Sequence, residues 1–193
     1  MFQLKQAQTQ QMVDAEQARL TRIAARLRQI EQEGKMPAYD VLVKQVDALL
    51  VATCREIVPL AGGFGQPYGK IVTYLDQQHV QPGSPILFLL HSRSEQRDDS
   101  LYIDVEAAIP LPTTLPGNEQ ITIRTLPGGL MACAIHTGAD FILGQAYAAL
   151  YRWIKDNGYQ VIGLPRQVYL RYGEHMNPNQ YLTEVQFPVN PKP

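Results

Sequence analysis

VLVKQV at 41–46, followed by LVA at 50–52, returns eighty positions later as ITIRTL at 121–126, followed by LMA at 130–132. In both places a short stretch rich in apolar residues, with polar residues between them, leads into a second apolar run. This pattern is typical of two successive β-strands. A pattern that recurs at a fixed distance predicts two copies of one supersecondary unit. The sequence therefore predicts a domain built from two similar halves.

Further matches follow in the same order along the chain. GQPY at 65–68 corresponds to GQAY at 144–147, and EAAIPL at 106–111 corresponds to EVQFPV at 184–189. The distance between matched positions drifts only from eighty to seventy-eight. We expect the two copies to pack about a pseudo-twofold axis, because the junction of two such halves is a common position for a ligand cleft.

The predicted fold class is α+β. Each repeat, 41–111 and 121–189, reads as β-β-α-β-β, and strand pairs that precede and follow a helix favour antiparallel pairing. Because only two or three turn-forming residues separate the first two strands of each half, we expect hairpins over 39–58 and 121–137. The whole is predicted to form a concave antiparallel sheet with a central ligand cleft, as one domain over 37–193.

Residues 1–36 are predicted to form a separate element, a long N-terminal helix over 12–33. Gly34 and Pro37 mark its end. Its apolar residues follow a narrow, heptad-like stripe with charged flanks, which is typical of a coiled coil. The stripe consists of Val13, Leu20, Ile23, Leu27 and Ile30, with an interruption at Glu16. Either this helix packs on its own domain, or it pairs with a second chain to form a homodimer.

Composition argues against nucleic-acid binding and against a membrane span. The 193 residues are 45% hydrophobic and 18% charged, with a formal net charge of -1. Domains that bind nucleic acid usually carry a clear basic excess, and no apolar run reaches the length of a transmembrane helix. The polar N-terminus lacks a signal-peptide core, so we expect a cytoplasmic protein.

The spacing of cysteines and histidines predicts no metal site, and no cofactor-binding fingerprint is present. Cys54 and Cys133 lie in apolar runs at matching places in the repeats. A pair of buried, reduced thiols is the favoured interpretation, with a disulfide or a reactive thiol as the alternative.

Glu106 and Glu184 are the first candidate ligand-binding residues. Each is a lone acid in an otherwise apolar or small strand, at the same place in its repeat. By strand alternation, Glu184 lies on the face away from Val185 and Phe187. A carboxylate at that place is either solvated or lines a cavity, and an unpaired buried carboxylate is costly.

Tyrosines form the second group of candidates. Tyr68 and Tyr147 begin the two predicted helices, and Tyr169 and Tyr181 lie in the last two strands. A tyrosine combines an apolar ring with a polar tip, which suits stacking on a ligand, although core packing is the alternative. A carboxylate among aromatic rings would favour an organic cation.

Several motifs resemble one known family. They are LPGGLMAC at 126–133, HTG at 136–138, the helix and its end over 143–159, and YLTEVQFPV at 181–189. Over 39–190 the chain is similar to the gyrase-inhibitor-like (GyrI-like) small-molecule-binding domain, which is also the effector-binding domain of MerR-type and AraC-type bacterial transcription regulators.

The resemblance implies a small-molecule ligand in an aromatic cage at the pseudo-twofold axis, with Glu184 as the acid of the final strand. In MerR-type relatives a long helix before this domain pairs with its counterpart, as expected for 12–33, and a DNA-binding domain precedes that helix. Too few residues precede 12–33 for such a domain. We therefore expect an orphan effector-binding protein or a fragment of a regulator that does not itself bind DNA.

One departure from the family weakens the expectation of multidrug binding. Multidrug-sensing relatives carry an acid after a Val-Tyr pair, whereas here Leu170 follows Val168-Tyr169. Some stand-alone relatives hydrolyse strained electrophiles with the final-strand glutamate, so a hydrolase that uses Glu184 is the alternative function. The sequence offers no second strong acid–base partner, which favours a binding module.

Overall fold

The computed structural model describes residues 39–92, 94–97, 99–139, 143–173 and 175–193. The chain divides into two units, 1–38 and 39–193, and the second contains all the described residues. The predicted helix over 12–33 and its pairing therefore lie outside the described residues.

Both repeats contain the predicted succession of two strands, a helix and further strands. The first repeat contains β1 (Val41–Val46), β2 (Leu49–Pro59), α2 (Gly65–Gln77), β3 (Ile86–Leu90), β4 (Glu95–Arg97) and β5 (Ser100–Pro110). The second contains β6 (Thr122–Leu126), β7 (Gly129–Thr137), α3 (Leu143–Asp156), β8 (Tyr159–Val161), β9 (Arg166–Arg171), the 3-10 turn η2 (Pro178–Gln180) and β10 (Leu182–Pro191). Two short strands, β4 and β8, were not predicted from the sequence.

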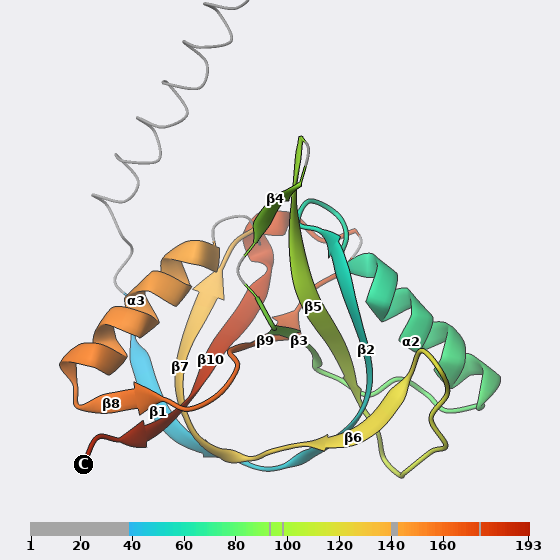
Figure 1. The fold of residues 1–193 in the computed structure, drawn as a ribbon, viewed down its shortest axis with the longest axis horizontal. Coiled ribbons are helices and arrows are strands. Elements are labelled where there is room, and N and C mark those ends of the chain that lie inside the picture. The colour runs from blue at the N-terminus through green and yellow to red at the C-terminus, as the bar shows by residue number, and fades with distance from the viewer. Residues whose placement is uncertain (1–38, 93, 98, 140–142, 174) are drawn as a thin grey trace, which may run out of the picture. The chain divides into compact units, whose positions relative to one another are not determined.

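The strands form one curved, antiparallel sheet in the order β1-β7-β10-β9-β3-β5-β2-β6, with β4 beside β5 and β8 beside β10 (Figure 1). The counterparts in the two repeats are β1 and β6, β2 and β7, β3 and β9, and β5 and β10. If each strand is replaced by its counterpart, the order read from one edge of the sheet becomes the order read from the other edge. The pseudo-twofold axis therefore passes between β9 and β3. The α+β class and the mostly antiparallel sheet are confirmed.

The two predicted hairpins are wrong. β1 pairs with β7 and β6 pairs with β2, so the first strand of each repeat forms the edge of the other half. A tight two-residue hairpin needs residues that readily take positive φ, and Asp47-Ala48 between β1 and β2 are poor candidates for this. The chain instead stays extended, and β1–β2 runs antiparallel to β6–β7 across the base of the domain (Figure 1).

Gly128 allows these two crossing segments to approach each other. A Cβ atom on Gly128 would lie 2.6 Å from the amide nitrogen of Ala48 and 2.6 Å from the carbonyl oxygen of Val46. Any other residue would push the segments apart. The Gly-Gly pair that suggested a hairpin turn therefore serves the crossing between the halves.

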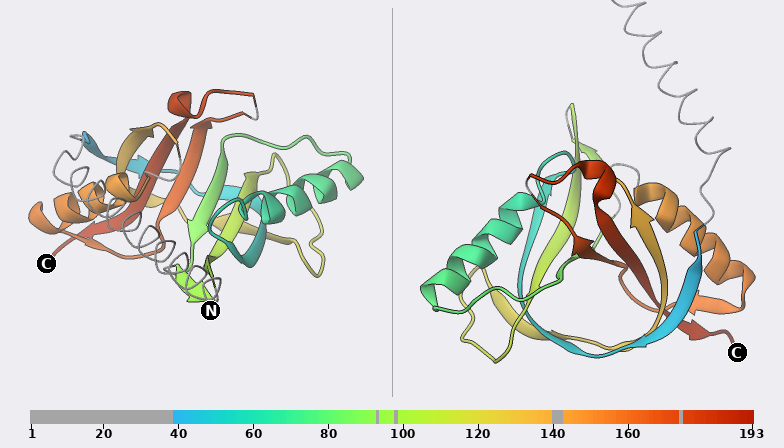
Figure 2. Two further views of the ribbon diagram at one scale, coloured as in Figure 1. Left: turned by 90° about the horizontal axis from the view of Figure 1, so that it is seen from above. Right: turned by 180° about the vertical axis from the view of Figure 1, so that it is seen from behind.

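Each helix covers one half of the sheet, on its outer side (Figures 1 and 2). Ile71 and Leu75 of α2 pack on β2 and β5, and Leu150 and Ile154 of α3 pack on β7 and β10. All four side chains are buried because the apolar positions of each helix recur on one face. A third cluster lies on the opposite face of the sheet and consists of Val51, Leu87, Leu89, Ala108, Leu126 and Val168.

The two cysteines are free and buried, as the favoured interpretation predicted. Burial raises the pKa of the Cys133 thiol to about 12 and raises that of Cys54 as well. A thiol that stays protonated at neutral pH is a poor nucleophile. Neither cysteine is therefore suited to a catalytic role.

Candidate functional site

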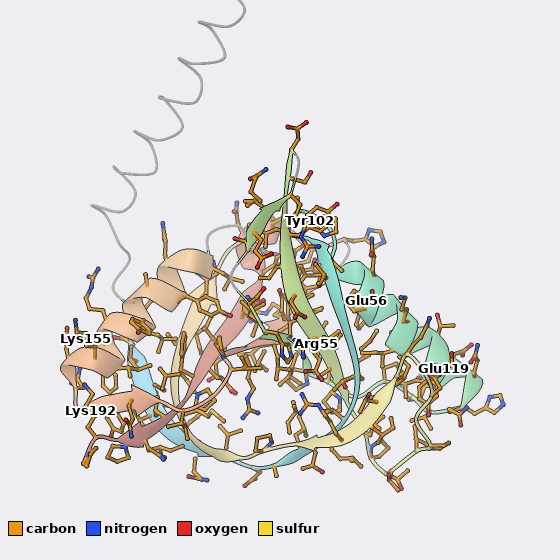
Figure 3. All side chains as sticks on the ribbon, viewed as in Figure 1. Arg55, Glu56, Tyr102, Glu119, Lys155 and Lys192 are labelled. Atoms are coloured by element: carbon orange, nitrogen blue, oxygen red, sulfur yellow. The ribbon has the colours of Figure 1, made fainter. Side chains whose placement is uncertain are left out.

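The two faces of the sheet separate the predicted site residues. In the antiparallel pairing of β10 with β9, Thr183 lies opposite Tyr169 and Glu184 lies opposite Val168. Residues opposite each other point to the same face, so Tyr169 lies on the helix-bearing face and Glu184 on the other, here called the inner face. Figure 3 shows the same alternation in β2, where Glu56 points toward α2 and Arg55 points to the inner side of the sheet.

Glu106 lies on the inner face, where its carboxylate is held by His91 and Arg124. Arg124 donates two hydrogen bonds to its carboxylate, at 2.8 and 3.0 Å, and His91 Nε2 lies 2.8 Å from Oε2. Burial alone would raise the pKa of Glu106, but hydrogen bonds from His91 and Arg124 outweigh this effect and hold it below its ordinary value. The carboxylate is therefore ionised and already paired.

Glu184 lies in the equivalent environment of the second half, with a different partner. Lys44 Nζ lies 2.6 Å from Oε1, and the Gln186 amide donates to Oε2 at 2.7 Å. The hydrogen bond to Glu184 raises the pKa of Lys44, which keeps the lysine charged. Lys44 comes from β1 and Arg124 from β6, so each acid is neutralised by a cation from the exchanged strand of the other repeat.

A cavity of about 720 Å³ lies on the helix-bearing face, beside the pseudo-twofold axis. It is bounded by the start of α2, by the segment that enters β3, and by the end of β9. Its lining residues are Phe64, Gly65, Tyr68, Ser84, Ile86, Phe88, Tyr169, Leu170, Arg171, Tyr172 and Gly173. Five of these eleven residues are aromatic, and the size is typical of a site for a small organic molecule.

The rings of this cavity are fixed by contacts with one another. The Phe88 ring lies edge-on against Phe64 and Tyr169, with centroids 5.2 and 5.4 Å apart. Tyr169 contacts Tyr172 at 5.3 Å, and Tyr172 contacts Tyr181 at 4.3 Å. Because such contacts hold the rings in defined orientations, the wall is largely preformed for stacking on a flat ligand.

A β-bulge in β9 shapes one edge of the cavity. Tyr169 pairs with Thr183 and Arg171 pairs with Leu182, which leaves Leu170 without a partner in the ladder. An extra residue in one strand re-aims the side chains around it. This accounts for the presence of Leu170 and Arg171, successive residues, in the lining of the same cavity.

The six predicted site residues do not form a single site. Tyr68 and Tyr169 line the cavity, whereas Tyr181 is not in its lining and contacts the lining residue Tyr172. Tyr147 packs edge-on against Phe187 beneath α3, with centroids 5.6 Å apart. Glu106 and Glu184 face the other side of the sheet. The interpretation of Glu184 as the charged centre of an aromatic cage with Tyr169 does not agree with this arrangement.

Sequence reasoning did not single out Phe64, Phe88, Leu170 or Arg171 as site residues. Phe88 lies in the apolar run Ile86–Leu90, which reads as an ordinary buried strand. In the sequence, Leu170 is distinctive only because multidrug-sensing relatives carry an acid at that position. Nothing in the sequence pattern around Arg171 distinguishes it from a solvated residue at the end of a strand.

A second depression, of about 520 Å³, runs along α2 beside the connection between the halves. It is lined mainly by polar side chains, and its lysine, Lys70, is paired with Glu56. Among the residues that the structure describes, no three or more His, Cys, Asp or Glu side chains gather as a metal site would require. Neither α2 nor α3 is long and apolar enough to cross a membrane, and these are the α-helices of the described part of the chain.

The fold and the cavity define a class of protein, a domain that binds small molecules. The model of the GyrI-like small-molecule-binding domain matches residues 39–190, and the chain belongs to this family. No curated protein matches the sequence.

Solved structures share the fold. The C-terminal domain of EcmrR is 25% identical, with a TM-score of 0.65, over 80% of this chain and 99% of that one. EcmrR in complex with DNA matches at 24% identity and a TM-score of 0.65, over 97% of this chain and 70% of that chain. A hydrolase encoded by lin2189 from Listeria innocua is 11% identical, with a TM-score of 0.59, over 84% and 97% of the two chains.

Proposed function

We propose that this chain binds a small aromatic molecule in the cavity between α2 and the bulged end of β9, as the effector-binding part of a bacterial transcription regulator or as a stand-alone relative of one. The observation that carries the proposal is the preformed wall of five rings around about 720 Å³. Burying a flat apolar ligand there would contribute roughly 25 cal/mol per Å² of apolar surface removed from water.

The geometry supports an apolar ligand better than a lipophilic cation. The expected cationic ligand depended on a carboxylate among the rings, and both candidate carboxylates belong to ion pairs on the inner face. At the position where multidrug-sensing relatives carry an acid, Leu170 lines the cavity.

Hydrolysis finds less support than binding. A hydrolase would need Glu184 to activate a water molecule beside the substrate. Glu184 is held by Lys44 and Gln186, on the face of the sheet opposite the aromatic cavity. The structural likeness to the Listeria hydrolase, at 11% identity, concerns the fold alone.

The test compares equivalent tyrosines of the two halves. Titration of a neutral aromatic probe, pyrene-1-carboxamide, should show saturable binding to the wild-type chain by fluorescence. Tyr68→Leu removes a cavity wall and should weaken binding about tenfold, the effect of roughly one lost aromatic contact. Tyr147→Leu, the matched change in the second half, should leave the affinity unchanged. Equal losses in both variants would contradict the assignment of the cavity.

The pairing of residues 12–33 with a second chain remains part of this proposal, as does the expected cytoplasmic location. Burial of the four aliphatic side chains of Leu20, Ile23, Leu27 and Ile30 would contribute about 1.5–3 kcal/mol each if it were complete, and partial burial together with the cost of association would leave a few kcal/mol. Sedimentation of the full chain against a version starting at Met36 should show concentration-dependent dimers only for the full chain. A monomer in both cases would contradict pairing.

A further inference from the structure

Among the residues that the structure describes, the walls of the aromatic cavity carry positive charge and no carboxylate. Of its eleven lining residues, the sole formally charged one is Arg171, and none is Asp or Glu. Arg171 is exposed at the end of β9, and the bulge at Leu170 brings it to the edge of the cavity. Among residues 39–92, 94–97, 99–139, 143–173 and 175–193, no acid forms an ion pair with Arg171.

The start of α2, which also lines the cavity, is a second source of positive potential. The helix α2 begins at Gly65, a lining residue, and is preceded by Phe64, whose side chain makes no capping hydrogen bond. No acid lies in its first turn. The first amide groups of a helix carry a partial positive charge, which is weakened where a capping or acidic side chain answers it. Neither is present here, but the Gln66 amide already donates to the carbonyl oxygen of Gly63 and Pro67 has no N–H, so the positive potential of this turn comes from the helix dipole and not from a row of open amides.

The same wall is open toward the cavity. A Cβ atom built on Gly65 would meet nothing within 4 Å. A negatively charged ligand group can therefore approach the first turn of α2 from the cavity without displacing a side chain.

From these features, and resting on the proposed function, we infer that the cavity selects a flat aromatic anion, such as an aromatic carboxylate. Its ring system would stack on Tyr68, Phe88 and Tyr169. Its carboxylate would lie toward the Arg171 guanidinium, with support from the first turn of α2. A guanidinium presents a planar pair of donors that matches a carboxylate.

Aromatic rings alone would attract a cation, so the two effects have to be weighed. A cation–π contact is the attraction of a charge to a quadrupole, and it is weaker than the interaction of two full charges at similar separation. A cation in this cavity would meet Arg171 and the positive end of α2, and none of the described lining residues is a carboxylate that could offset them. The charge-bearing groups therefore decide the preference.

The experiment uses three pyrene probes of similar size and different charge: pyrene-1-carboxylate, pyrene-1-carboxamide and (1-pyrenylmethyl)trimethylammonium. Fluorescence titration of the full chain should give the tightest binding for the carboxylate and the weakest for the ammonium compound. Arg171→Gln should weaken the carboxylate about two- to fivefold, as expected for one solvent-exposed, charge-assisted contact, and leave the carboxamide unchanged. Arg152→Gln, on the exposed surface of α3 and outside the cavity lining, is the matched control and should change nothing.

A second variant distinguishes a loss of binding caused by charge from a loss caused by misfolding. Gly65→Asp places an acid in the first turn of α2, where it should favour the helix itself, yet it should weaken the carboxylate and strengthen the ammonium probe. If the ammonium probe binds wild type as tightly as the carboxylate, or if Arg171→Gln weakens all three probes equally, the charge preference is wrong while the proposed binding function stands. If even the carboxamide fails to bind, both are wrong.

Discussion

The two halves of this domain share a topology but differ in the side chains that they place beside the pseudo-twofold axis. Phe88 of β3 and Gln167 of β9 lie directly opposite each other at the pseudo-twofold axis, on the helix-bearing face. Phe88 extends the aromatic wall of the first half, whereas Gln167 accepts a hydrogen bond from the Tyr169 hydroxyl at 3.1 Å. The cavity therefore lies beside α2, where the sequence at the axis is apolar.

The helix starts show the same divergence. Tyr68 faces the cavity, while Tyr147, its match in the repeat, is packed against Phe187. A repeated fold thus supplies two equivalent positions, and only one is used for the proposed site. Symmetry of the backbone predicts where a site can form, and the side chains decide in which half it does.

The largest predicted effect is on stability, and it tests whether the two helices are packed on the sheet in the same way. Leu75 of α2 and Ile154 of α3 are equivalent and fully or almost fully buried. Truncation of either to alanine should lower the free energy of unfolding by about 2–5 kcal/mol, because each leaves a cavity in its own cluster. Urea denaturation followed by circular dichroism measures both. A cost below about 1 kcal/mol for one of them would mean that its helix is not packed as the other is.

A smaller effect should separate the halves by function. Phe88→Leu and Phe187→Leu each remove aromatic edge contacts, and each should cost about 1–2 kcal/mol of stability. Only Phe88→Leu should also weaken pyrene-1-carboxamide binding, because Phe88 lines the cavity and Phe187 does not. An affinity loss in Phe187→Leu as large as in Phe88→Leu would break the comparison.

The Arg124–Glu106 pair should lose its contribution to stability in acid, and the Lys44–Glu184 pair should lose its contribution in alkali. Because the folded-state pKa of Glu106 lies below the ordinary 4.5, its contribution to stability is present above 4.5 and lost as pH falls through the lower value. Because the pKa of Lys44 is raised above 10.5, its contribution is present below 10.5 and lost as pH rises through the higher value.

Two variants test this difference. Glu106→Gln should cost about 1–2 kcal/mol at pH 7, and its difference from wild type should shrink in acid. The difference for Lys44→Met should shrink instead in alkali. Urea unfolding across pH measures both profiles, and identical profiles for the two variants would contradict the assignment.

The smallest effect concerns two tyrosine hydroxyls. Burial raises the pKa of the Tyr147 hydroxyl, the Gln167 side chain offsets part of this rise, and no well-formed hydrogen bond from the hydroxyl is present among the described residues, so Tyr147→Phe should change stability by less than about 1 kcal/mol. Tyr169→Phe loses the hydrogen bond to Gln167 and should destabilise by about 1 kcal/mol. Thermal unfolding of both variants gives the sign, and a clear loss in Tyr147→Phe would reveal a partner for that hydroxyl.

Much of the fold was predictable because it depends on local patterns. The repeat and its apolar pattern predicted the order of the main strands and helices in each half, and α2 and α3 begin within a few residues of Tyr68 and Tyr147, where the sequence predicted the two helices to start. Alternation also placed Glu184 on the face opposite Phe187, which packs with α3. These features depend on a period of two or of 3.6 residues, which a single sequence displays.

The sequence by itself therefore determined the two-part architecture, the family and the supply of aromatic and acidic residues. Tertiary structure alone decided that the first strands exchange halves, since strand pairing depends on which distant edge is available. That exchange brings Lys44 to Glu184 and Arg124 to Glu106, and so turns two candidate ligand acids into internal ion pairs. Tertiary structure also decided that a bulge at Leu170 brings Arg171 to the aromatic cavity. The register of two paired strands depends on both strands, so neither strand's sequence alone predicts it.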